Sequence, residues 1–165
     1  MNLNPNRKCQ IVHADATEYV ERIHALFLEY AESLGFSLCF QGFDEELARL
    51  PGKYSRPEGR LLLVRQDDAD AGCVGVQRLE SNLCEMKRMY VKPIFRGRGL
   101  GRALAETAIC EARAAGYQAM RLDTIEPRMS SAVALYRTLG FVEIAPYRPN
   151  PIPGALCMEL VLVGK

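Results

Sequence analysis

The residues best suited to chemistry lie in one short segment, residues 91–102, where an apolar strand runs through a proline into a turn rich in glycine and arginine. Gly97 and Gly99 let the backbone turn tightly and approach a ligand closely. A helix that opens near Leu100 aims its unpaired N–H groups and the positive end of its dipole at the same place. The segment therefore predicts a site for an anion.

The spacing of the glycines narrows the choice of anion. A dinucleotide-binding loop needs Gly-x-Gly-x-x-Gly, but Arg102 takes the last place after Gly97 and Gly99. A Walker loop ends in Gly-Lys-Ser or Gly-Lys-Thr, and this sequence does not. What remains is Arg-x-x-Gly-x-Gly, formed by Arg96, Gly99 and Gly101, between a strand and a helix. The alternative is a glycine-rich turn that only connects the two elements.

Composition excludes several classes of protein. The 165 residues fit one domain with a core of ordinary size, and a formal net charge of +1 favours neither a nucleic acid nor a membrane surface as the partner. The basic residues are concentrated locally instead, as expected for a partner with several phosphates. They are Lys87, Arg88, Lys92, Arg96, Arg98 and Arg102.

The cysteine and histidine pattern argues against a metal site. The six cysteines form no Cys-x-x-Cys pair, and His13 and His24 are the two histidines. Residues 1–5 lack the apolar core of a signal peptide, and no apolar run approaches the roughly 18 residues of a membrane span. We therefore expect a reduced, cytoplasmic protein without a resident metal.

Apolar periodicity predicts the elements that must position the anion site. The expected strands cover residues 8–13, 60–65, 73–79, 84–91, 119–124, 141–145 and 156–163, and the expected helices cover 15–34, 45–50, 100–115 and 130–139. The strands over 60–91 should form an antiparallel meander, followed by a helix that crosses over to a parallel strand. We expect side-chain caps from Asp15, with Glu18 completing a capping box, from Asp44, and from Ser130 or Ser131.

One strand carries an irregular pattern. Cys84 and Met86 keep a period of two, but the next apolar pair, Met89 and Val91, is shifted by one position. A β-bulge near residues 87–88 would return all four side chains to one face, and such bulges bend a strand and leave backbone groups unpaired. The alternative is that residues 87–88 mark a solvent-exposed edge.

The order of these features resembles the GCN5-related N-acetyltransferase (GNAT) superfamily over nearly the whole chain. The specific parts are residues 89–91, the loop 96–101, and the Ala-x-x-Leu-Tyr-x-x-x-Gly-Phe pattern of residues 132–141. The resemblance, closest to uncharacterised bacterial members, implies a single α/β domain with a mixed, mostly antiparallel sheet of about seven strands and helices on both faces. One departure is Met129, because many members carry asparagine at that place.

The resemblance also implies the cofactor and the residues that bind it. Acetyl-coenzyme A would be the co-substrate, with its pantetheine arm received by the backbone of the strand and its pyrophosphate by the glycine turn. The implied cofactor-binding residues are Met89, Tyr90, Val91, Arg96, Gly97, Arg98, Gly99, Leu100, Gly101 and Arg102.

Three catalytic roles follow from transfer to an amine: a base for the amine, a donor for the developing negative charge, and an acid for the leaving thiolate. The resemblance nominates Glu85 as the base, with Asp123 as the competing carboxylate, and Tyr136 as the acid. A backbone N–H near Met89 is the simplest donor. The alternatives are an exposed strand glutamate at Glu85 and a core tyrosine at Tyr136.

The acetyl acceptor is expected to be a primary amine of a small molecule or peptide. In this fold, residues 36–46 and 147–154 flank the thioester, and Asp44, Glu45 and Glu46 could attract an amine. Two other classes stay open: a non-catalytic sensor that binds acyl-coenzyme A, and a nucleic-acid binder, which the net charge disfavours. Members of this superfamily are frequently homodimers, so a dimer is possible here.

Overall fold

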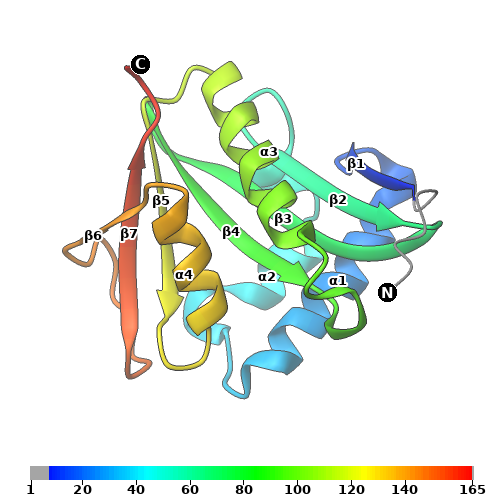
Figure 1. The fold of residues 1–165 in the computed structure, drawn as a ribbon, viewed down its shortest axis with the longest axis horizontal. Coiled ribbons are helices and arrows are strands. Elements are labelled where there is room, and N and C mark those ends of the chain that lie inside the picture. Colours follow the sequence, from blue (N-terminus) through cyan, green and yellow to red (C-terminus); the bar gives the residue numbers. More distant parts are fainter. Residues whose placement is uncertain (1–7, 165) are drawn as a thin grey trace.

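The computed structural model describes residues 8–164 and contains one seven-stranded sheet with helices on both faces (Figure 1). The strands are β1 (Cys9–His13), β2 (Arg60–Gln66), β3 (Ala69–Glu80), β4 (Leu83–Val91), β5 (Ala119–Ile125), β6 (Val142–Ile144) and β7 (Ala155–Val161). The helices are α1 (Thr17–Leu34), α2 (Phe43–Ala48), α3 (Leu100–Ala114) and α4 (Ser130–Thr138), with short 3-10 turns η1 (Cys39–Gln41), η2 (Gly52–Tyr54) and η3 (Pro93–Phe95). The prediction about a signal peptide concerns residues 1–5, which lie outside the residues that the structure describes.

The strands follow the order β1-β2-β3-β4-β5-β7-β6. Strands β1 to β4 form the predicted antiparallel meander, and β4 pairs with β5 in parallel after the chain has crossed over through α3. Strand β7 inserts between β5 and β6 and runs antiparallel to both. The predicted mixed, mostly antiparallel sheet is therefore confirmed. Along residues 8–164, no helix is long and apolar enough to cross a lipid bilayer.

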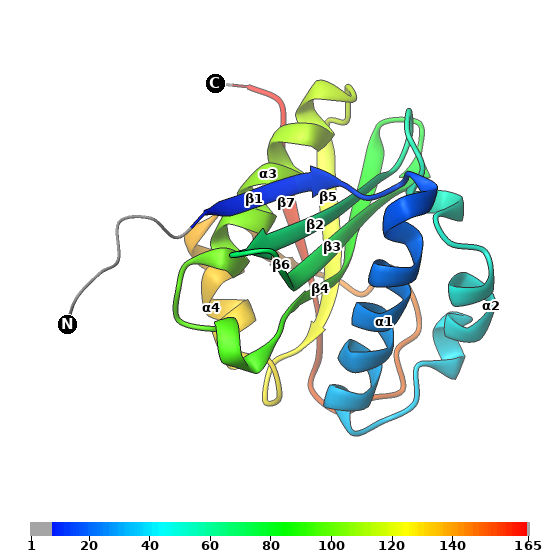
Figure 2. The same cartoon turned by 90° about the vertical axis from the view of Figure 1, so that its right-hand side faces the viewer.

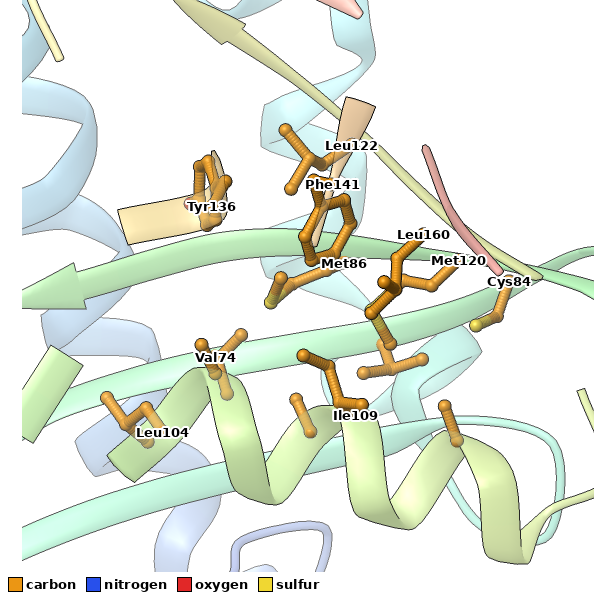
Figure 3. Close-up of a cluster of buried hydrophobic side chains, with 14 of the residues drawn as sticks. Val74, Cys84, Met86, Leu104, Ile109, Met120, Leu122, Tyr136, Phe141 and Leu160 are labelled. Carbon is orange, nitrogen blue, oxygen red and sulfur yellow. The ribbon is translucent and has the colours of Figure 1, made fainter. Parts of the chain in front are cut away.

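The helices form two layers, with α1 and α2 on one face of the sheet and α3 and α4 on the other (Figure 2). Because successive side chains of a strand point to opposite faces of the sheet, each layer of helices packs on its own hydrophobic core. Val74 and Met86 of β3 and β4 face Leu104 and Ile109 of α3 (Figure 3). The core under α1 contains Phe27, Tyr54, Leu61, Leu63 and Cys73, among others.

Substitution of Leu104 by alanine should destabilise the fold substantially. The Leu104 side chain is fully buried in the centre of the α3 layer. Its removal leaves a cavity in a close-packed core, so the free energy of unfolding should fall by about 2 to 5 kcal/mol. Urea denaturation followed by circular dichroism measures this change. A loss below about 1 kcal/mol would mean that α3 is not packed on the sheet as described.

The predicted bulge lies in β4. Between the pairs Cys73–Tyr90 and Gly75–Lys87, the single residue Val74 of β3 faces two residues of β4. The first of these two, Arg88, has a φ of 57°, which is uncommon for a residue with a side chain.

The bulge has the predicted effect on the side chains of β4. Cys84, Met86, Met89 and Val91 all pack into the α3 layer. The solvent-exposed edge is excluded as an explanation of the irregular pattern, because both residues 87 and 88 are buried.

The predicted side-chain cap of α1 is wrong. The helix begins at Thr17 after Ala16, with no capping hydrogen bond from a side chain. Asp15 instead accepts hydrogen bonds from Arg56 Nε and Nη2, at 3.0 and 3.1 Å. A guanidinium offers two parallel, charge-assisted hydrogen bonds, and these hold the carboxylate away from the helix end.

The predicted caps of α2 and α4 are also wrong. Helix α2 begins at Phe43 after Gly42, whose φ of 67° suits glycine, so Asp44 falls inside the first turn. Helix α4 follows Met129 without a side-chain cap, because the preceding turn, closed by the bond from Met129 N to Ile125 O at 2.9 Å, brings both serines into the helix.

Three strands differ most from the prediction. Strand β3 begins at Ala69 rather than at residue 73, because Ala69 and Asp70 pair with Gln66 and Arg65 across a short turn. Strand β6 covers Val142–Ile144 rather than residues 141–145, because Phe141 N donates to Tyr136 O and so continues the end of α4. Strand β7 covers Ala155–Val161 rather than residues 156–163. Segment 147–154 precedes β7 as a loop, as predicted.

Candidate functional site

The central sheet opens between its two parallel strands. Strands β4 and β5 pair over residues 83–85 and 119–121, and their remaining parts diverge toward the lower edge of Figure 1. A cavity of about 810 Å³ occupies this opening, with residues 86–91 of β4 and residues 122–125 of β5 in its walls. The bulge lies in the β4 wall, beyond the last pair with β5. Backbone groups of Arg88 and Met89 are therefore positioned to pair with an extended ligand, as an added strand would.

The glycine turn forms one end of the cavity. Gly97 and Gly99 have φ values of 75° and 79°, and Gly99 directly precedes α3. Among the described residues, a Cβ built on either glycine meets no atom within 4 Å. Both glycines line the cavity together with Leu100 and Gly101. The turn thus presents open backbone and the first amides of α3 to the cavity, which suits a phosphate group.

The three arginines of the turn are held differently. Arg96 lines the cavity and donates from Nε to Val91 O at 2.9 Å. Arg98 Nη1 donates to Gln66 Oε1 at 3.4 Å, and Arg102 Nη2 donates to Thr138 Oγ1 at 2.9 Å. Of the three arginines of the turn, Arg96 is therefore the one that lines the cavity.

Lys87 and Arg88 are not part of the phosphate end. They lie in the part of β4 that faces α2 and η1, where Arg88 Nε donates to Glu46 Oε2 at 2.9 Å and Arg88 Nη1 to Gln41 Oε1 at 2.8 Å. Lys87 Nζ donates to the same Gln41 oxygen at 3.4 Å. The prediction that all six clustered basic residues serve phosphates is wrong for these two, because the strand directs their side chains to the other face of the sheet.

Tyr136 belongs both to the core and to the cavity wall. It comes from α4, its ring packs on Phe141 with 5.7 Å between ring centroids, and it is 7% exposed (Figure 3). Burial raises its pKa above the usual value for tyrosine. The phenol therefore keeps its proton at neutral and alkaline pH, which suits a proton donor.

The two candidate carboxylates occupy different environments. Glu85 is fully buried and accepts hydrogen bonds from Gln77 Nε2 at 2.6 Å and from the side chains of Tyr147 and Arg148. The alternative of an exposed strand glutamate is therefore wrong. Asp123 lines the cavity and accepts from Gln41 Nε2 at 3.3 Å and from Asn150 Nδ2 at 3.2 Å.

The segments expected to flank the acceptor reach the cavity through a few side chains. Phe36, Leu38, Phe40 and Gln41 come from the connection between α1 and α2, and Asn150 comes from the loop before β7. Sequence reasoning did not single out Gln41 or Asn150. Their positions follow from contacts across 82 and 27 residues of chain, for which the sequence alone has no signal.

The sequence offers three acidic residues that could attract an amine. Of these, Glu46 is buried, whereas Asp44 and Glu45 are exposed in the first turn of α2. Met129, where many relatives have asparagine, lines the cavity, and its sulfur accepts a hydrogen bond from Thr124 Oγ1 at 3.2 Å. In the described range, no group of three or more His, Cys, Asp or Glu side chains is arranged to hold a metal ion.

Comparison with known proteins assigns the family. Residues 57–143 match the model of the acetyltransferase (GNAT) domain. The chain is 41% identical to an uncharacterised N-acetyltransferase of Schizosaccharomyces pombe, over 82% of this chain and 83% of the relative. A GNAT-family acetyltransferase of Staphylococcus aureus has the same fold, with a TM-score of 0.79, 20% identity and coverage of 94% and 100%. Another structure of this fold, the acetyltransferase yncA of Salmonella typhimurium with its cofactor acetyl-CoA, matches with a TM-score of 0.68, 20% identity and coverage of 96% of both chains. This chain belongs to the GNAT acetyltransferase family and is an acyltransferase.

Proposed function

We propose that the protein transfers the acetyl group of acetyl-coenzyme A to a primary amine of a small molecule or peptide. The observation that carries the proposal is the opening between β4 and β5, which joins the glycine turn and the bulged strand in one cavity of about 810 Å³. Acetyl-CoA accompanies the Salmonella typhimurium acetyltransferase of the same fold, which supports it as the donor. The six free cysteines suit a reducing compartment, so the proposal places the protein in the cytoplasm.

The residues present fit an extended donor with a pyrophosphate at one end. The amides that open α3 and the side chain of Arg96 would hold the phosphates, and the open space at Gly97 and Gly99 leaves room for them. The backbone of residues 88–91 would hydrogen-bond the amides of the pantetheine arm. The bound donor supplies a thioester, an activated acyl group.

The residues of the chain would supply the proton transfers. An N–H near Met89, at the bulge, is the simplest donor to negative charge developing on a carbonyl oxygen. Tyr136 keeps its proton and would deliver it to the leaving sulfur. Asp123, on the cavity wall, would receive a proton of the amine, directly or through water. Glu85 stays an alternative base. A proton that moves from the cavity to Glu85 would pass Lys87, whose Nζ lies 3.7 Å from Glu85 Oε1.

A thiol-release assay tests the proposed function. Purified protein is mixed with acetyl-coenzyme A and a panel of amino acids, polyamines, aminoglycosides and peptides, and free thiol is followed with a chromogenic disulfide. We expect release that depends on one class of amine, with the acetylated product seen by mass spectrometry. Calorimetric binding of acetyl-coenzyme A without any amine-dependent release would instead support the sensor alternative.

Exchange of each carboxylate for its amide should identify the base. Asp123→Asn should lower kcat/KM at pH 7 by about tenfold while preserving its hydrogen bonds with neighbouring amides. The deficit should shrink toward pH 10, because a primary amine then loses its proton without help. The matched variant Glu85→Gln should show no such recovery at alkaline pH. The opposite result, an alkaline rescue of Glu85→Gln alone, would assign the role to Glu85.

A further inference from the structure

Two side chains of opposite charge flank the point where the sheet opens. The parallel pairing ends at Glu85 opposite Arg121, and Lys87 and Asp123 follow two residues later on their respective strands. Side chains two positions apart on a strand lie on the same face. Lys87 and Asp123 therefore share the face covered by α1 and α2, and both line the cavity.

Gln41 spans the distance between these two groups. Its Nε2 donates to Asp123 Oδ2 at 3.3 Å, and its Oε1 accepts from Arg88 Nη1 at 2.8 Å and from Lys87 Nζ at 3.4 Å. The ammonium and the carboxylate are thus separated by one side-chain amide and two long hydrogen bonds. A ligand that replaces the amide in this bridge must offer a cation to Asp123 and an anion to Lys87 within a short span.

The buried carboxylates Glu46 and Glu85 on this face of the sheet pair with other cations. Glu46 pairs with Lys53 at 3.2 Å and with Arg88 at 2.9 Å, and Glu85 pairs with Arg148. Lys87 Nζ lies 3.7 Å from Glu85 Oε1, although its side chain is only 3% exposed. Glu85 shares its charge between this ammonium and Arg148, so Lys87 is only partly compensated and an added anion would be stabilised there.

The titration of Lys87 agrees with this geometry. Burial, opposed by Glu85 and assisted by the cationic neighbours Arg88, Arg148 and Lys53, lowers the pKa of Lys87 to about 8. An anion bound beside the ammonium would raise this pKa again. At neutral pH, most Lys87 side chains carry the charge that such an anion needs.

We propose that the acetyl acceptor carries a carboxylate beside its amine, as a free amino acid does, and that Lys87 binds this carboxylate while Asp123 binds the amine. This inference rests on the proposed acetyl transfer and narrows its acceptor class. Lys87 is then a specificity-determining residue, since the reaction itself does not need its charge.

Matched pairs of acceptors test the inference. Thiol release is measured with α- and β-amino acids and with the carboxamide of each, which keeps the amine and removes the anion. For the best acceptor we expect a kcat/KM at least about tenfold higher for the acid than for its amide, a modest value for one buried charge pair. In Lys87→Met the ratio of kcat/KM for the acid to kcat/KM for the amide should fall to near one. The value for the acid should fall, and the value for the amide should stay the same. Lys8→Met, which removes the same charge from an exposed residue directly before β1, should keep the preference.

The pH profile gives a second readout. Lys87 loses its charge as the pH rises through about 8, so KM for the acid should increase above that pH, whereas KM for the amide should not. Unchanged calorimetric affinity of Lys87→Met for acetyl-coenzyme A verifies its fold. Equal use of acid and amide by the wild type, or an acid preference that survives in Lys87→Met, overturns this inference and leaves acetyl transfer intact. If no amine of the panel increases thiol release, the proposed function is contradicted as well.

Discussion

Gly99→Asp should abolish measurable binding of acetyl-coenzyme A. The φ of 79° at this position is one that aspartate tolerates better than most residues, and its Cβ would meet open space, so the protein itself should accept the change. The new carboxylate would stand where the amides of α3 begin, against the proposed site of the pyrophosphate. Like charges in contact cost several kcal/mol, so the affinity should fall on the order of a thousandfold.

Calorimetry with acetyl-coenzyme A measures this loss, and Gly99→Asn is the matched control. Asparagine has the same size and the same tolerance of positive φ but carries no charge, so its affinity should fall by only about tenfold. Thermal unfolding of both variants separates a binding defect from a folding defect. Wild-type affinity in Gly99→Asp would show that the turn does not hold the phosphates.

Tyr136→Phe should lower kcat by about a hundredfold and change the affinity for acetyl-coenzyme A little, because the phenol would act on the leaving sulfur alone. The ring would keep its packing on Phe141, so the wall of the cavity would stay in place. Since burial raises the pKa of Tyr136, the wild-type kcat should not decline between pH 7 and 9 through loss of this proton.

Steady-state kinetics with the identified acceptor measures the effect of Tyr136→Phe. Tyr117→Phe is a suitable control, because it removes a phenol that donates to Glu58 O at 2.7 Å, away from the residues that line the cavity. This control should turn over at the wild-type rate. If Tyr136→Phe does so too, Tyr136 is a core residue and the leaving thiolate takes its proton from solvent.

Features that depend on neighbouring residues were predicted well from the sequence. The turn around Gly97 and Gly99 follows from residue types within six positions, and the bulge at Arg88 follows from the shifted apolar pattern of one strand. The order of strands and helices follows from periodicity, with errors of about one or two residues at most ends and a larger one at the start of β3, which is Ala69 rather than residue 73. Such features are local because backbone conformation and the alternation of faces are set within a few residues.

Features that depend on distant partners were not predicted from the sequence. The sequence predicts Asp15 as a helix cap, but in the structure it accepts a hydrogen bond from Arg56. The sequence also predicts Lys87 as a phosphate ligand, but its side chain donates to Gln41. Each polar side chain has several possible partners, and the choice among them depends on which strands and loops the fold brings together.

The sequence by itself therefore determined the turn proposed to hold the donor, the distorted strand beside it and the family. Only the tertiary structure decided that Glu85 is enclosed, that Asp123 stands on the cavity wall, and that Lys87 faces it across the opening. The reason is physical: the donor end is a local backbone conformation, whereas the acceptor end is assembled from side chains that meet only when β4, β5, η1 and the loop before β7 come together.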